Sequence, residues 1–153
     1  MEQLSIGFIG FGEAGSTIAG GLRSAGIDRL FAYDINTHDA DLGPRIHQRA
    51  AATATTLLTT SLEVANASDV LFSTVTSSAA LDAATETAPF LGARHVYADL
   101  NSVSPARKQE IGAVIAGAGA GFVEAAVMAP VAPTGTVCRC CSAARRRAAS
   151  PTS

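Results

Sequence analysis

The stretch Ile6-Gly7-Phe8-Ile9-Gly10-Phe11-Gly12-Glu13-Ala14-Gly15 decides the fold of this 153-residue chain. The apolar run over 4–9 predicts a buried strand, and apolar residues at helical spacing over 13–25 predict a helix. The glycines between them have the spacing G-x-G-x-x-G. In such a unit the first glycine permits a tight turn, the second lets a diphosphate approach the backbone, and the third lets the helix pack closely. The stretch therefore predicts a dinucleotide-binding unit; the alternative is a simple turn between strand and helix.

An acidic residue follows the second predicted strand, at a position suited to contact the adenosine ribose of a dinucleotide. Asp34 follows the next predicted strand, over 30–33, and comes 19 residues after Gly15. A carboxylate at this place accepts hydrogen bonds from the ribose hydroxyls and repels a 2′-phosphate. The pattern favours NAD as the cofactor and leaves NADP open. The alternative is that Asp34 only caps the next turn.

The rest of the chain continues to alternate apolar runs with helical patterns. We expect a helix and a short strand within 36–60, where the pattern is least regular. Ser104 and Pro105 predict a helix start, with a hydroxyl at the N-cap and proline at the first helical position. The remaining expected elements are strands at 70–75, 95–98 and 122–127 and helices at 61–67 and 78–89. This alternation indicates an α/β fold, namely a doubly wound, mostly parallel sheet in a single domain.

Composition excludes several classes of protein. Hydrophobic residues make up 48% and charged residues 16% of the chain, which disfavours disorder, and a net charge of −2 favours no nucleic-acid partner. Residues 111–133 are long enough to cross a bilayer, but four glycines and Pro130 interrupt them, so we expect no membrane span. No basic region precedes an apolar stretch at the N-terminus. A cytoplasmic location is therefore expected.

The composition changes abruptly near residue 136. Residues 136–153 contain four arginines, all three cysteines and no acid, whereas residues 1–135 hold seven basic and 13 acidic residues. We therefore expect a domain over 1–135 and an irregular basic tail over 136–153 that is out of frame. GC-rich codons can be chosen for 137–145 that, read two nucleotides later, encode Val-Pro-Leu-Leu-Leu-Ser-Gly-Pro, so the sequence is compatible with a shifted frame. Sequencing the gene locus tests this hypothesis.

Four separated motifs in order resemble the β-hydroxyacid dehydrogenase and 6-phosphogluconate dehydrogenase superfamily. They are the segments 6–12, 75–76, 99–105 and 122–127, and the resemblance covers about 1–135. Asn101-Ser102 and 127–130 are most similar to a branch of phosphogluconate-dehydrogenase-like oxidoreductases. The resemblance implies a Rossmann domain of an NAD(P)-dependent dehydrogenase or reductase acting on a CH–OH group of a hydroxyacid-type small molecule.

The resemblance also implies which residues contact the cofactor. The glycine-rich stretch would hold the diphosphate, Asp34 the adenosine ribose, and two later loops the nicotinamide end. The expected cofactor-binding residues are Gly10, Phe11, Gly12, Glu13, Ala14, Gly15, Asp34, Val75, Thr76, Asn101 and Ser102.

The resemblance implies no catalytic residue within this chain. The family's catalytic lysine lies in a later helical domain, and its Ser-Gly-Gly substrate loop is replaced here by 128–130. We interpret Lys108, the only lysine, as a solvated helix residue. The histidines and the cysteine cluster 138–141 lack ligand spacing, so we expect no metal site.

Two other functions remain as alternatives. The chain could be a non-catalytic nucleotide-binding module or sensor, or a Rossmann enzyme that uses S-adenosylmethionine. The motifs after residue 70 argue against the second. The sequence leaves the oligomeric state open. We expect this short chain to be a truncated and inactive form of the enzyme.

Overall fold

The computed structural model describes residues 3–125. The predicted tail over 136–153, the last part of the predicted domain over 1–135 and all three cysteines lie outside these residues. The elements are β1 (Ser5–Ile9), α1 (Glu13–Ser24), β2 (Arg29–Tyr33), α2 (Gly43–Thr53), β3 (Thr56–Leu57), α3 (Ser61–Ala67), β4 (Val70–Ser73), the short 3₁₀ helix η1 (Ser77–Ala79), α4 (Ala80–Thr87), the 3₁₀ helix η2 (Ala88–Phe90), β5 (Val96–Asp99), α5 (Pro105–Gly117) and β6 (Gly121–Glu124).

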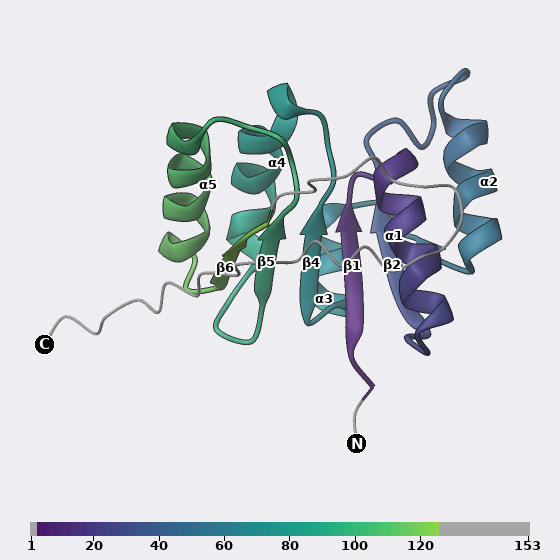
Figure 1. Cartoon of the computed structure of the whole chain (residues 1–153), viewed down its shortest axis with the longest axis horizontal. Coiled ribbons are helices and arrows are strands. Elements are labelled where there is room, and N and C mark those ends of the chain that lie inside the picture. Colours follow the sequence, from purple (N-terminus) through teal and green to yellow (C-terminus); the bar gives the residue numbers. More distant parts are fainter. Residues whose placement is uncertain (1–2, 126–153) are drawn as a thin grey trace, which may run out of the picture.

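The six strands form one parallel sheet in the order β3-β2-β1-β4-β5-β6 (Figure 1). The chain moves outward from β1 to β3, returns to pair β4 with β1, and then moves outward to the other edge. This order confirms the predicted doubly wound Rossmann sheet. Ligands of such sheets bind at the carboxyl ends of the strands near the point where the strand order reverses, here between β1 and β4.

Apolar side chains on the two faces of the sheet form two cores. Ile6 and Phe8 of β1 pack with Ala19 of α1 and Ala50 of α2. On the other face, Leu71 of β4 and Tyr97 of β5 pack with residues of α3, α4 and α5. Helices on both faces of β1 and β2 explain why these strands read as nearly continuous apolar runs.

Most predicted elements agree with the structure within a few residues, with one main difference. The helix expected at 78–89 is divided into η1, α4 and η2, with Pro89 inside η2. Helix α1 packs on the core through Gly15 and Ala19, whereas Ala14 is exposed in its first turn. Gly15 lets the start of α1 pack closely on Thr74 and on the turn after β1.

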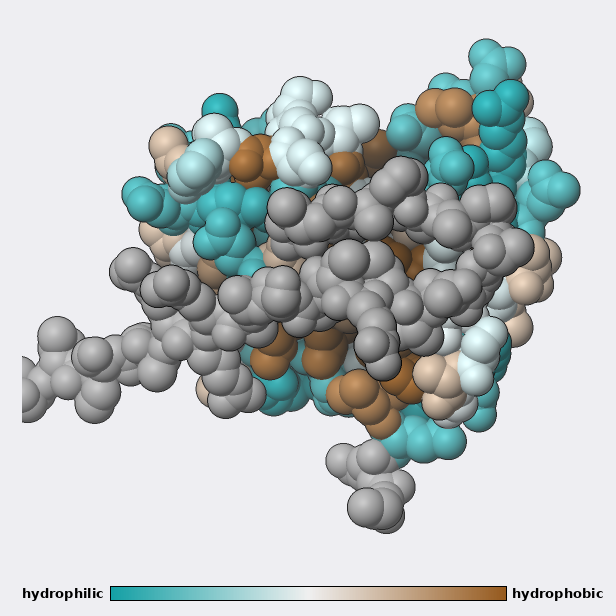
Figure 2. Space-filling model, viewed as in Figure 1, coloured by the Kyte–Doolittle hydropathy of each residue, from teal (hydrophilic) through white to brown (hydrophobic). Residues whose placement is uncertain are grey.

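One half of the sheet has no described helix over one of its faces. In the view of Figure 1, strands β4 to β6 are seen with α4 and α5 behind them. Figure 2 shows hydrophobic side chains over the strands in the lower middle of this view, while the outer helices are mostly hydrophilic. In the part of the chain that the structure describes, no helix combines the length and apolarity needed to cross a bilayer.

Gly7 of β1 lies where α3 approaches the sheet. A Cβ atom added there would be 2.4 Å from Val64 Cγ1 and 2.5 Å from Ser68 Oγ. We expect Gly7→Ala to lower the free energy of unfolding by about 1–3 kcal/mol, because the added methyl overpacks the contact with α3. Urea unfolding measures the loss. Gly117→Ala is the control, since nothing lies within 4 Å of its added Cβ; equal stability of the two variants would contradict the expectation.

Candidate functional site

The turn after β1 depends on glycine at its first position. Gly10 has φ +88°, a conformation that L side chains rarely adopt, and its amide donates to Tyr33 O at 2.8 Å. An added Cβ would stand 2.6 Å from Thr74 O, a backbone atom that cannot move aside. The turn thus ties the carboxyl ends of β1, β2 and β4 together.

The second glycine faces open space. Nothing lies within 4 Å of a Cβ added at Gly12, which is the N-cap of α1. No side chain caps this helix end, and the first intrahelical bond is donated by Ser16 N to Gly12 O at 3.0 Å. The amides of the first turn and the positive end of the helix dipole are therefore directed at a space that a diphosphate would fit.

The third glycine allows close packing between helix and sheet. A Cβ at Gly15 would be 2.7 Å from Thr74 Oγ1, and this hydroxyl donates to Gly10 O at 2.7 Å. Thr74 therefore braces the whole turn from β4. Thr74 is not among the residues predicted from the sequence, although a polar residue near the end of the apolar run 70–75 is a signal for it.

Three of the residues expected to bind the cofactor can contribute only certain atoms. The Phe11 side chain is fully buried and packs edge-to-face on Phe8, with ring centroids 5.5 Å apart. Its ring lies in the core, and its amide donates to Asp34 Oδ2 at 2.8 Å. Glu13 and Ala14 are exposed in the first turn of α1, where their amides are the groups suited to an anion.

Asp34 is held against the glycine-rich turn. Its Oδ2 accepts from Phe11 N at 2.8 Å, and its Oδ1 accepts from Asn36 N at 2.8 Å. The alternative reading of Asp34 as a turn cap thus describes one of its two oxygens. Each carboxylate oxygen has further lone-pair capacity, so the group can also accept from ribose hydroxyls.

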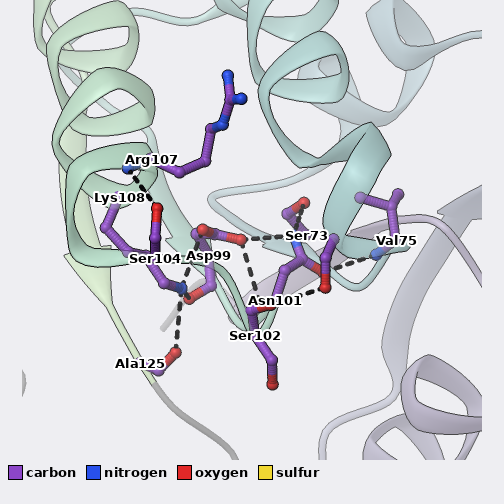
Figure 3. A network of polar contacts seen from close by, with 10 residues as sticks. Ser73, Val75, Asp99, Asn101, Ser102, Ser104, Arg107, Lys108 and Ala125 are labelled. Atoms are coloured by element: carbon purple, nitrogen blue, oxygen red, sulfur yellow. Dashed lines mark hydrogen bonds and ion pairs between the residues drawn. The ribbon is translucent and has the colours of Figure 1, made fainter.

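A polar network joins the carboxyl ends of β4 and β5 (Figure 3). Asn101 Oδ1 accepts from Val75 N at 2.9 Å, and Asn101 Nδ2 donates to Ser73 Oγ at 2.9 Å and to Asp99 Oδ1. Because Asn101 is 5% exposed and its amide is used within the protein, its side chain positions Val75.

Exposed hydroxyls border this network. Thr76, Ser77 and Ser102 are exposed at the ends of β4 and β5, and Ser77 Oγ donates to Ser102 O at 2.7 Å. The structure therefore brings all the sequence-predicted site residues to one edge of the sheet, in a row across β2, β1, β4 and β5.

The prediction that Lys108 is solvated is wrong. Lys108 is 6% exposed, and its Nζ lies 2.9 Å from Asp99 Oδ2. Nζ also donates to Asp99 O at 3.0 Å and to Ala125 O at 3.4 Å. The helical spacing of Lys108 with Ile111 and Ile115 places all three on the face of α5 that packs on the sheet.

Of the three histidines, only His95 is buried and hydrogen-bonded within the fold. His95 is buried, with Nδ1 accepting from Gly92 N at 2.9 Å and Nε2 lying 2.8 Å from Ala65 O, while His38 and His47 are exposed. Within residues 3–125, no three His, Cys, Asp or Glu side chains gather as metal ligands.

Comparison with known proteins agrees with this geometry. The profile of the family described as the NAD binding domain of 6-phosphogluconate dehydrogenase matches residues 5–137. No curated protein sequence matches the chain significantly.

Solved structures with the same arrangement are numerous. A conserved hypothetical protein from Sinorhizobium meliloti 1021 is 40% identical, with a TM-score of 0.77, over 85% of this chain and 43% of that one. The conserved protein MTH1747, described as structurally similar to 3-hydroxyacid dehydrogenases, is 33% identical, with a TM-score of 0.70, over 84% of this chain and 45% of that one.

A third structure shares the fold at lower identity. The 3-hydroxyisobutyrate dehydrogenase of Mycobacterium tuberculosis is 20% identical, with a TM-score of 0.72, over 85% of this chain and 42% of that one. The chain thus spans less than half the length of these proteins. Together with the glycine-rich turn, the carboxylate at Asp34 and the strand order, the profile match shows that the chain belongs to the family of NAD-binding domains of 6-phosphogluconate dehydrogenase.

Proposed function

We propose that this chain is the cofactor-binding part of an NAD-dependent oxidoreductase that acts on the CH–OH group of a hydroxyacid-type substrate. The observation that carries the proposal is the hydrogen bond that holds Asp34 against the glycine-rich turn. The Asp34 carboxylate is hydrogen-bonded to the amide of Phe11, directly beside the open position at Gly12. One turn can therefore serve both the diphosphate and the ribose of the same dinucleotide.

Each group of residues has a separate task in this proposal. The first-turn amides of α1 bind the diphosphate, and Asp34 accepts from the adenosine ribose hydroxyls. Val75, Thr76 and Ser102 border the nicotinamide end, where Asn101 holds the backbone of Val75. When bound, the nicotinamide supplies the hydride acceptor or donor. The protein supplies the position and the orientation.

Calorimetric titration with NAD and NADP tests the choice of cofactor. We expect NAD to bind more tightly, because the Asp34 carboxylate repels a 2′-phosphate. Asp34→Ser should narrow the difference between the binding free energies of NAD and NADP by on the order of 1–2 kcal/mol, since charge-assisted hydrogen bonds to the ribose are lost. Asp41→Ser removes the same charge from an exposed position in the following loop and should leave the difference unchanged. Equal or tighter NADP binding by the unaltered chain would contradict the role of Asp34.

We further propose that the domain comprises 1–135 and that residues 136–153 are translated out of frame, in agreement with the composition change there. The family resemblance implies a catalytic lysine in a later helical domain. Lys108 is buried and ion-paired with Asp99, so it is not free to exchange a proton with a substrate. An uninterrupted natural stop in this frame, with no helical domain encoded downstream in another frame, would overturn this part of the proposal.

We expect the chain by itself to bind a dinucleotide and to turn nothing over. Positioning of a substrate accounts for roughly 7–11 kcal/mol of barrier lowering. Within residues 3–125, the residues that we assign to the nicotinamide end all lie at the ends of β4 and β5. The measurement is nicotinamide absorbance at substrate saturation with a panel of hydroxyacids, beside a titration that confirms binding. Turnover that Gly12→Asp abolishes would show that these 153 residues suffice for catalysis.

A further inference from the structure

Lys108 is unusual because it is a lysine on the buried face of α5, which packs on the sheet. It is the only lysine of the chain, and it is 6% exposed, whereas its neighbours Arg107 and Gln109 are exposed. Burying an ammonium group costs several kcal/mol unless it is paired and hydrogen-bonded. Its burial beside the candidate site therefore needs an explanation.

The ammonium group has one ion-pair partner, the Asp99 carboxylate, and two hydrogen-bond acceptors, which are backbone carbonyls. Nζ lies 2.9 Å from Asp99 Oδ2, 3.0 Å from Asp99 O and 3.4 Å from Ala125 O. Asp99 is the last residue of β5, and Ala125 follows the last residue of β6. Lys108 thus joins the carboxyl ends of two neighbouring strands from the helix that connects them.

The network continues from Asp99 toward the site (Figure 3). Asp99 Oδ1 accepts from Asn101 N at 3.2 Å and from Asn101 Nδ2, and Asn101 Oδ1 accepts from Val75 N at 2.9 Å. A continuous path of side chains therefore leads from Lys108 through Asp99 and Asn101 to the backbone of Val75. Ser102 follows Asn101 directly and is exposed.

We propose that Lys108 is a positioning residue for the nicotinamide end of the site. It acts through Asp99 and Asn101, whose geometry sets the places of Val75 and Ser102, while the adenosine end at Gly12 and Asp34 has no residue in this network. The inference rests on the proposed function. A merely stabilising role explains the pair less well, because apolar replacements of a buried ion pair are often neutral or stabilising.

The test compares two ligands that share the adenosine half. ADP-ribose lacks the nicotinamide that NADH carries, so the ratio of their dissociation constants reports on the nicotinamide end alone. In Asp99→Val/Lys108→Met, which leaves no buried unpaired charge, we expect ADP-ribose affinity within twofold of the unaltered chain. The ratio of the dissociation constant of ADP-ribose to that of NADH should fall about tenfold, because hydrogen bonds that position the nicotinamide end are lost. Arg107→Met, the matched control one residue away, should leave the ratio unchanged.

A second measurement needs no variant. Lysine acetylation, followed by peptide mass spectrometry, measures how often the network opens to expose the Lys108 amine. At equal fractional saturation, NADH should slow acetylation of Lys108 several-fold more than ADP-ribose does.

The outcomes separate this inference from the proposed function. An unchanged ratio in the double variant, or equal protection by the two ligands, would overturn the role of Lys108. Failure of the unaltered chain to bind either ligand would instead overturn the proposed function.

Discussion

Gly12→Asp is expected to abolish dinucleotide binding without unfolding the protein. Nothing lies within 4 Å of the added Cβ, and aspartate is a favoured N-cap residue, so the helix should be as stable as before. The new carboxylate would occupy the space that faces the first-turn amides of α1. Two like charges 4 Å apart near a protein surface repel by about 4 kcal/mol, which lowers the affinity for NADH about a thousandfold.

Gly21→Asp is the matched control for this experiment. It introduces the same charge on the same helix, at a position where an added Cβ also has no atom within 4 Å. We expect its affinity for NADH, measured by calorimetry, to stay within a few-fold of the unaltered chain. If the Gly12→Asp protein bound NADH as tightly as the unaltered chain, the diphosphate could not bind at the N-terminus of α1.

Lys108→Met is expected to be the most destabilising single change near the site. The methionine keeps most of the apolar stem, but the carboxylate of Asp99, with its side chain 1% exposed, loses its counter-ion. Removing one partner of a buried ion pair costs about 3–5 kcal/mol, a large part of the stability of a domain of this size. Urea unfolding followed by circular dichroism measures this loss.

Two comparisons identify the cause of the loss. Asp99→Val added to Lys108→Met removes the unpaired charge and should recover part of the stability. Arg107→Met breaks an exposed pair with Glu110, 2.9 Å apart, and should change the free energy of unfolding by less than about 1 kcal/mol. A Lys108→Met protein as stable as Arg107→Met would contradict the importance of the pair.

Local patterns were enough to predict most of the fold. The apolar run before Gly10, the spacing of the three glycines and the N-cap at Ser104 are all properties of a few consecutive residues. Ser104 Oγ indeed accepts from Arg107 N at 3.3 Å. The strand order follows because alternating strands and helices with right-handed crossovers allow few other arrangements.

The row of candidate site residues was also predictable, because the carboxyl ends of parallel strands meet at one edge of the sheet. Asp34 could be assigned from its distance to Gly15 along the chain. The sequence could not show that its carboxylate also holds the Phe11 amide, because that contact joins residues 23 positions apart.

The sequence by itself therefore determined the class of fold, the order of its elements and the position of the glycine-rich turn. Only the tertiary structure decided the roles of Lys108, Asn101 and Thr74. Each of these side chains has partners on other elements, so its burial depends on how the elements cross. For Lys108 the helical spacing with Ile111 and Ile115 indicated a buried face, but the general cost of burying an amine favoured solvent. The carboxylate of Asp99 and the carbonyl of Ala125 offset that cost, and these acceptors come together only when β5, α5 and β6 pack against one another.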